Sequence, residues 1–377
     1  MLTYKTCFLP YIYIKRLLCF SANSYYLLFI IIPFFFPLIL KVWSSKVQQT
    51  IKITYPHYVS PERTDLPYRF YSVALYHNEA YPFALRINAQ SAYVHKFLLI
   101  CSNRSFQGNG IEQANFHPFE DIVHELGDRL VIRYYFDEVE ITPYDQSREK
   151  LHRNSATQFL AELHPRDQDI IFFSDIDEIA FSDAFEDVLL DPPSTVRFYT
   201  AISTQYTTRW VFDEFWYQPF FANYGWLTKK CPIPINTLFQ IYNWKNIHDH
   251  DYPVRDLPHT RHFSNFFNSI SQLQNKLAST SSNKKYNIYP INDTTRLFIY
   301  AACGKDYITG KKGKLIPPID TKFAPILNDI RMIKFNSKIA FDNLDGVDIR
   351  KFKIFKACSD AYQYYQALVQ QNAIHIR

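Results

Sequence analysis

Three acidic residues follow a strongly apolar stretch and are the first candidates for chemistry. The segment DIIFFSDIDEIA spans residues 169–180, so Asp175, Asp177 and Glu178 emerge where a buried strand reaches solvent. Burying ionised carboxylates without a counter-charge costs several kcal/mol, because each carboxylate loses its hydration. A divalent cation such as Mn²⁺ or Mg²⁺ removes that cost, and it commonly binds one or two carboxylates together with substrate phosphates. The D-x-D pattern therefore suits a metal ion that holds a nucleotide diphosphate.

Two other interpretations of these acids stay open. The carboxylates could lie at the positive end of a following helix, with Ser182 or Asp183 as its N-cap. Aspartyl phosphatases of the haloacid dehalogenase type also have a strand followed by D-x-D, with the first aspartate as nucleophile. Their motif normally lies on the first strand and continues with Thr or Val. Here several expected strands precede the motif, and Glu178 and Ile179 follow it.

A mostly parallel sheet is expected to position the acids. Apolar runs predict strands at residues 70–76, 97–101, 130–135 and 169–174, and apolar spacing predicts helices at residues 80–92 and 148–163. Hydrophobic strands that alternate with helices indicate an α/β fold with both faces of its sheet covered. Such sheets bind ligands beyond the carboxyl ends of their strands. Two further helices are predicted at residues 270–278 and 359–370.

Composition excludes several classes of protein. The chain has 377 residues, of which 47% are hydrophobic and 20% charged, so it is not intrinsically disordered as a whole. Its net charge of +5 is too small to indicate a nucleic-acid partner. The six cysteines include no C-x-x-C pair, so a structural zinc site is not expected. In an oxidising compartment the four cysteines after residue 40 could form up to two disulfides.

An apolar segment near the N-terminus predicts a membrane anchor. Residues 25–40 read YYLLFIIIPFFFPLIL, and Val42 and Trp43 extend this apolar character. A helix that spans a bilayer needs about 20 such residues, and membrane helices tolerate proline better than soluble ones do. A signal peptide is the competing interpretation, but no small-x-small cleavage site follows. A buried apolar segment is a further alternative.

The expected organisation is a tail at residues 1–24, a transmembrane signal anchor at 25–43, a stem at 44–66 and one domain at 67–377. Lysines on both sides of the span leave its orientation undecided by charge. Two N-x-S/T sequons, at Asn103 and Asn292, fit a lumenal domain.

Three separated segments together resemble glycosyltransferase family 17, which includes β-1,4-mannosyl-glycoprotein 4-β-N-acetylglucosaminyltransferase. Residues 75–109 are similar to the family's N-E-x-x-x-x-x-x-R helix and the strand after it, through Asn78, Glu79 and Arg86. Residues 148–180 carry Arg153 and the sequence SDIDEIA in place of the family's S-D-x-D-E-I-P. Residues 261–280 match through His262, Ser264, Lys276 and Leu277.

The resemblance implies a GT-A fold, in which an α/β domain binds a UDP-sugar through a divalent cation. It implies inverting transfer of GlcNAc from UDP-GlcNAc, β-1,4 to a mannose of an N-glycan. The metal ligands would be Asp175, Asp177 and Glu178. The residues around the donor would be Asn78, Glu79, Arg86, Arg153, Asp175 and His262.

Inverting transfer requires one general base, which takes the proton of the acceptor hydroxyl. The first candidates are Asp213 and Glu214 in the aromatic segment WVFDEFW, and Asp249 and Asp251 come next. The chain also departs from the family, since Cys101 replaces a usual Glu and residues 280–283 read TSSN in place of S-H-x-E. A catalytically inactive glycan-binding relative is therefore one alternative, and a metal-dependent phosphatase is another.

Together, the anchor and the resemblance imply a single-pass type II protein of the Golgi or ER membrane. Its catalytic domain would be lumenal. Its partners would be a nucleotide sugar and a glycan or glycoprotein acceptor.

Overall fold

The computed structural model describes residues 58–105, 110, 113–136, 147–205, 210–241, 252–264, 273–274, 276 and 314–315. All of them belong to the larger of two compact units, Pro56–Arg377. The tail, the predicted anchor and the first part of the stem lie outside the described residues. Within the described segments, no helix is both long and apolar enough to cross a bilayer.

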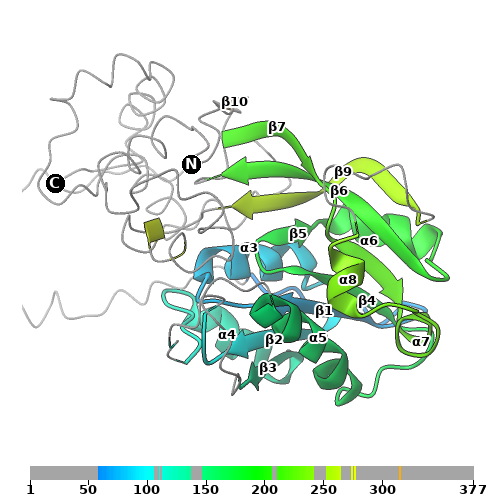
Figure 1. Ribbon diagram of the computed structural model, residues 1–377, viewed down its shortest axis with the longest axis horizontal. Helices are drawn as coiled ribbons and strands as arrows, with labels where there is room; N and C mark the ends of the chain where they lie inside the picture. The colour runs from blue at the N-terminus through cyan, green and yellow to red at the C-terminus, as the bar shows by residue number, and fades with distance from the viewer. Residues whose placement is uncertain are drawn as a thin grey trace, which may run out of the picture. The chain divides into compact units, whose positions relative to one another are not determined.

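The described residues form a ten-stranded sheet (Figure 1). Four neighbouring strands run parallel in the order β4-β1-β2-β3, and their bounds are β1 Phe70–Leu75, β2 Val94–Ser102, β3 Leu130–Tyr135 and β4 Ile170–Asp175. Beyond β4 the order continues through β8 Phe220–Asn223, β6 Val196–Gln205, β7 Trp210–Trp216 and β10 Lys314–Leu315, all paired antiparallel. The long β9 Val254–Ser264 runs parallel to β6 and antiparallel to the short β5 Glu178–Ala180.

The four predicted strands are confirmed, and the parallel arrangement holds for them. The remaining strands make the sheet mixed rather than mostly parallel. For β6 and β7 the physical reason is that only a short stretch of sequence separates them, and such a short connection allows only antiparallel pairing, whereas parallel neighbours need a long crossover. The next strand, β8, follows β7 closely in sequence and pairs with the preceding part of β6 in the same antiparallel sense.

Helices cover both faces of the parallel strands (Figure 1). Ile170 and Phe172 of β4 pack into one hydrophobic cluster with α3 and α6. Ile171 and Phe173, the alternate residues, pack into a second cluster with α5 and α8. The helices are α3 Ala80–Gln90, α4 Glu120–Leu126, α5 Ser147–Ala161, α6 Ser182–Leu190, α7 Tyr224–Lys229 and α8 Ile235–Phe239, with a 3₁₀ turn at Gly127–Arg129.

The first two predicted helices are confirmed as α3 and α5. Of the predicted helix at 270–278, residues 273, 274 and 276 are described and helical. The predicted helix at 359–370 lies outside the described residues. The two described cysteines, Cys101 and Cys231, form no disulfide in the structure.

The register of the parallel strands aligns two chain segments that matter for function. Leu75, the last residue of β1, lies opposite Asp175, the last residue of β4. The turn after β1 and the turn after β4 therefore leave the sheet at the same edge. This is the carboxyl edge, where sheets of this kind bind ligands.

A close backbone approach makes Gly225 a sensitive position. A Cβ atom at this residue would lie 3.0 Å from the Cβ and the carbonyl oxygen of Asp167, and the Gly225 N–H donates to that same carbonyl. We expect Gly225→Ala to lower the free energy of unfolding by about 1–3 kcal/mol, because the backbone must shift. Urea denaturation measures the change. Gly110→Ala, where a Cβ meets nothing within 4 Å, is the matched control, and equal losses in the two variants would contradict this explanation.

Candidate active site

Acidic side chains from two turns meet at the carboxyl edge of the sheet. Glu79 follows β1 and lies at the N-cap position of α3. Asp177 lies in the turn between β4 and β5. The Lys276 ammonium joins the two, with its Nζ 2.6 Å from Glu79 Oε1 and 3.1 Å from Asp177 Oδ2.

The ion pair with Lys276 sets the charge states of the group. Burial disfavours the charged form of Asp177, but Lys276 and His262 outweigh it and lower the pKa of Asp177 below its usual value. Burial raises the pKa of Glu79 to about 7, even though Lys276 opposes that shift. Asp177 is therefore the carboxylate of this pair that carries a full negative charge at neutral pH.

His262 reaches the same place from β9. The antiparallel pairing of β5 with β9 sets it opposite Glu178, and its Nε2 lies 3.8 Å from Asp177 Oδ2. Its ring stacks on the indole of Trp216, with the centroids 4.7 Å apart, and Ser264 Oγ lies 2.9 Å from its Nε2. Burial lowers the pKa of His262, which favours the neutral imidazole.

Glu178 is buried below this surface and both of its oxygens are hydrogen-bonded. The Asp175 backbone N–H donates to Oε2 at 2.9 Å, and the Trp216 indole N–H donates to Oε1. Burial, with the nearby charges of Asp175 and Asp177, raises the pKa of Glu178 well above its usual value. The geometry makes Glu178 a support of the turn rather than a group open to a ligand.

Asp175 is held by an arginine on α5. Arg153 Nη2 donates to Asp175 Oδ2 at 2.8 Å, and its Nη1 lies 2.5 Å from Glu149 Oε1. The guanidinium also lies over the ring of Phe239, 4.4 Å from its centroid. The Arg153 side chain is only 4% exposed, whereas that of Asp175 is 30% exposed, so the aspartate is the member of the pair that solvent can reach.

Arg86 lies fully buried beneath the turn. Its Nη1 donates to Ser174 Oγ at 2.7 Å and to the carbonyl oxygens of Asp175 and Glu178, each at 3.1 Å. Its Nε donates to Ser72 Oγ at 3.0 Å. These contacts fix the backbone that carries the acids and leave the guanidinium inaccessible to a phosphate.

With all of its carboxylates ionised, the group would carry more negative than positive charge. The carboxylates are Glu79, Glu149, Asp175, Asp177 and Glu178, and the cations that contact the group are Arg86, Arg153 and Lys276. Among the described residues this leaves two negative charges without a fixed counter-charge when all the carboxylates are ionised. Burial and neighbouring carboxylates raise the pKa of Asp175 in spite of Arg153, as expected for an acidic group that lacks enough positive charge.

The carboxylate oxygens of Asp175 and Asp177 fit a metal ion whose other ligands come from a substrate. Asp175 Oδ1 is enclosed and has no hydrogen-bond partner in the described part of the chain. No group of three His, Cys, Asp or Glu side chains among the described residues could hold a metal ion by itself. One or two carboxylates with phosphate oxygens completing the shell are the usual ligands of Mg²⁺ in proteins, so Asp175 and Asp177 fit a metal–diphosphate complex and not an all-protein cage.

The helix-capping interpretation of the acids is wrong. The short strand β5 separates the D-x-D turn from α6, and Phe181 lies at the N-cap position of that helix, with Ser182 and Asp183 in its first turn. The strand β5 could not be predicted from the sequence, because a strand of three residues is too short to show an alternating pattern.

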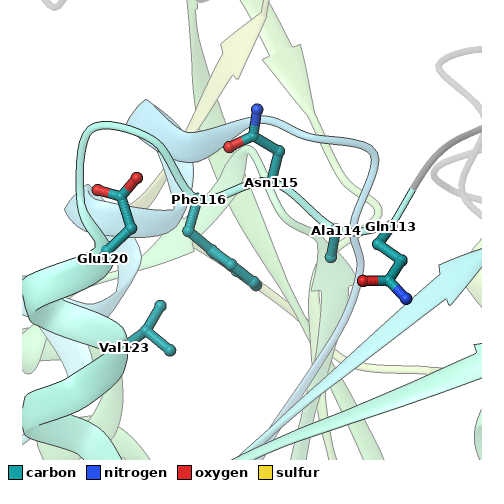
Figure 2. A pocket seen from close by; sticks show the side chains of 6 residues that line it. All are labelled: Gln113, Ala114, Asn115, Phe116, Glu120 and Val123. Atoms are coloured by element: carbon teal, nitrogen blue, oxygen red, sulfur yellow. The ribbon is translucent and has the colours of Figure 1, made fainter.

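Asn78 accepts a hydrogen bond from the segment that contains Asn115. It has a positive φ of 62°, and its Oδ1 accepts from the Asn115 backbone N–H at 2.9 Å. Asn115 lines an open hollow of about 370 Å³, next to Phe116 and across from Val123 of α4 (Figure 2). The hollow is lined by Gln113, Ala114, Asn115, Phe116, Glu120 and Val123. None of the acidic residues of the turns lines it.

The side chains of the predicted general bases lie outside the described residues. Asp213 and Glu214 lie on β7, which pairs with β6, but their side chains fall outside the described part of the structure, as do Asp249 and Asp251 entirely. Their role stays a prediction.

Sequence reasoning gave no role to three residues that complete the group. Lys276 lies 99 residues from Asp177 and 197 from Glu79, so no local pattern links them. Trp216, on β7, is also distant in sequence from its partner Glu178, so no local pattern links these two residues either. Glu149 could have been found, because it lies four residues before Arg153 on one helix face.

The Trp216 indole is expected to be required for stability. Trp216→Phe keeps an aromatic ring beside His262 but removes the N–H that donates to the buried Glu178 carboxylate. We expect a loss of about 1–3 kcal/mol in the free energy of unfolding, measured by urea denaturation. Trp226→Phe, at a tryptophan that packs on Tyr252, is the matched control and should cost less. A Trp216→Phe protein as stable as the wild type would contradict this role.

Two solved structures show a distant likeness to this chain. The inositol-1-phosphate CTP transferase from T. maritima is 10% identical, with a TM-score of 0.27, over 58% of this chain and 98% of that one. A candidate glucose-1-phosphate thymidylyltransferase from Bacillus anthracis, solved with a sucrose, is 8% identical, with a TM-score of 0.23, over 50% of this chain and 86% of that one. No curated protein matches the sequence.

Comparison with protein families gives a match over less than half of the chain. The model of glycosyltransferase family 17 matches residues 39–190, which include β1, β4 and the acidic turn. The third segment of the resemblance, at residues 261–280, lies outside that match. The match makes this part of the chain similar to glycosyltransferase family 17 and supports a glycosyltransferase enzyme, a class of enzyme that acts on a sugar donor and an acceptor.

Proposed function

We propose that the protein transfers GlcNAc from UDP-GlcNAc to a mannose of an N-glycan, in a β-1,4 linkage and with inversion. The observation that carries the proposal is the convergence of Asp175, Asp177 and His262 at the carboxyl edge of the sheet, where the two aspartates lie in the segment that matches family 17 and His262 lies outside it. The choice of GlcNAc and of the linkage rests on the resemblance to the bisecting enzyme.

Asp175 and Asp177 would hold Mn²⁺ or Mg²⁺ together with the diphosphate of the donor. When bound, the metal ion supplies Lewis-acid stabilisation of the departing UDP. The residues of the protein position the aspartates and provide a further contact. Arg153 orients the Asp175 carboxylate, Glu178 and Arg86 fix the turn, and neutral His262 lies beside Asp177 as a further contact for the metal or a phosphate.

The predicted anchor and the resemblance to family 17 lead to a proposal for where in the cell the enzyme acts. We propose a type II protein of the Golgi or ER membrane, with the domain at residues 67–377 in the lumen. The acceptor would be a glycoprotein, and Asp213 or Glu214 would act as the general base.

The decisive experiment is a donor screen of the full-length chain in non-ionic detergent, with an N-glycan acceptor and with or without Mn²⁺. We expect release of UDP from UDP-GlcNAc that depends on both Mn²⁺ and acceptor. Failure of UDP to bind with or without Mn²⁺ would favour an inactive glycan-binding protein. Hydrolysis of a simple phosphomonoester that is lost on changing Asp175 alone would favour a phosphatase.

A further inference from the structure

Lys276 contacts the Asp177 carboxylate to which the proposed function assigns a donor-bound cation. Its ammonium contacts Asp177 Oδ2 at 3.1 Å and Glu79 Oε1 at 2.6 Å, and its side chain is 24% exposed. A divalent ion that binds Asp177 through this oxygen would compete with the ammonium for it and be repelled by its charge. The chain thus carries its own counter-ion for the carboxylate that the proposed reaction uses.

The other two cations of the group are fixed in place. Arg153 is held by two carboxylates and a phenylalanine ring, and Arg86 is bonded to backbone carbonyls and serine hydroxyls. Among the described cations that contact the acidic group, Lys276 combines partial exposure with a flexible four-carbon stem. It is the cation that can move without breaking the fold of the turn.

Glu79 provides a pivot for that movement. It is the nearer of the two carboxylates, and its backbone carbonyl accepts from the Phe83 N–H at 3.0 Å in the first turn of α3. The ammonium can therefore leave Asp177 and stay paired with Glu79. The side chain keeps a partner while the oxygen of Asp177 becomes free.

We propose that Lys276 makes metal binding depend on the nucleotide. This inference rests on the proposed function. Without a diphosphate, a divalent ion on Asp177 would lie close to the Lys276 ammonium and be repelled. A diphosphate removes the repulsion, because its negative oxygens can pair with both cations. Lys276 is then a positioning residue that blocks the metal alone and accepts the metal–diphosphate complex.

The test is calorimetric titration of Mn²⁺ into the full-length chain in detergent, alone and in the presence of UDP. Lys276→Met should bind Mn²⁺ alone at least about tenfold more tightly than the wild type, since a close like charge is removed. The gain in Mn²⁺ affinity on adding UDP should shrink in this variant. Lys276→Arg, which keeps the charge, should bind like the wild type.

Lys229→Met is the matched control, because Lys229 pairs with Asp167 at 2.6 Å on an exposed surface and should not affect Mn²⁺. Lys276→Gln keeps a hydrogen-bond donor for the carboxylates and makes the same test if Lys276→Met does not fold. Equal or weaker Mn²⁺ binding by the uncharged variants would overturn the inference. A wild type that binds no UDP with Mn²⁺ would instead overturn the proposed function, and the titrations with Mn²⁺ alone would still decide the role of Lys276.

Discussion

Asp177→Asn is expected to abolish UDP-sugar turnover in the presence of Mn²⁺, with a loss on the order of 100-fold or more. Asparagine has nearly the same shape but no charge, so it can neither hold a divalent cation as strongly nor balance Lys276. The backbone carbonyl of Asp177, which accepts from the Phe263 N–H at 2.7 Å, is unaffected by the change. The measurement is UDP release from UDP-GlcNAc with an N-glycan acceptor, at saturating Mn²⁺.

The control for this variant is Asp167→Asn, the same chemical change at an exposed aspartate whose partner is Lys229. It should keep wild-type activity. The thermal midpoints of both variants should be recorded, so that a loss of activity is not confused with unfolding. An Asp177→Asn protein that is folded and as active as the Asp167→Asn control would contradict the proposed role of Asp177.

Arg86→Met is expected to cause the largest loss of stability, on the order of 4 kcal/mol in the free energy of unfolding. Methionine replaces only the apolar stem of the arginine and has no donors, so the carbonyl oxygens of Asp175 and Glu178 and the hydroxyl of Ser174 lose their buried partner. The positive charge beneath the acidic turn is lost as well. Urea denaturation measures the effect.

The comparison for Arg86→Met is Arg133→Met. Arg133 pairs with Glu162 at 2.8 Å on the surface, and such pairs contribute about 1 kcal/mol or less. Arg86→Lys should fall between the two, because an ammonium keeps the charge but cannot reach several carbonyls at once. Equal losses for Arg86→Met and Arg133→Met would show that the buried guanidinium does not hold the turn.

Local pattern was enough to predict the parallel half of the fold. The apolar run before Asp175 is long and uninterrupted, and α3 and α5 have apolar residues at helical spacing, so strand and helix types followed directly. Because parallel sheets bind ligands beyond the carboxyl ends of their strands, the acids that follow this strand were predicted to lie at the ligand site. β5 and the antiparallel strands could not be predicted in the same way, because their pairing is decided by distant residues of β6 and β9.

The site was predictable only as far as its local motif extends. Asp175 and Asp177 were found from the strand that precedes them. The roles of Glu178 and Arg86 as internal supports depend on burial and on hydrogen bonds to the backbone, which residue type does not reveal. Lys276 was visible only as a match to a family motif, and its contact with Asp177 arises from tertiary folding.

The most direct test of the account is calorimetric titration of UDP into the full-length chain, with Mn²⁺ and again after chelation of the metal. We predict that UDP binds when Mn²⁺ is present and that binding is lost both on chelation and in Asp177→Asn. UDP affinity that is the same with and without Mn²⁺, or that survives unchanged in Asp177→Asn, would contradict the claim that these aspartates hold a cation on the diphosphate.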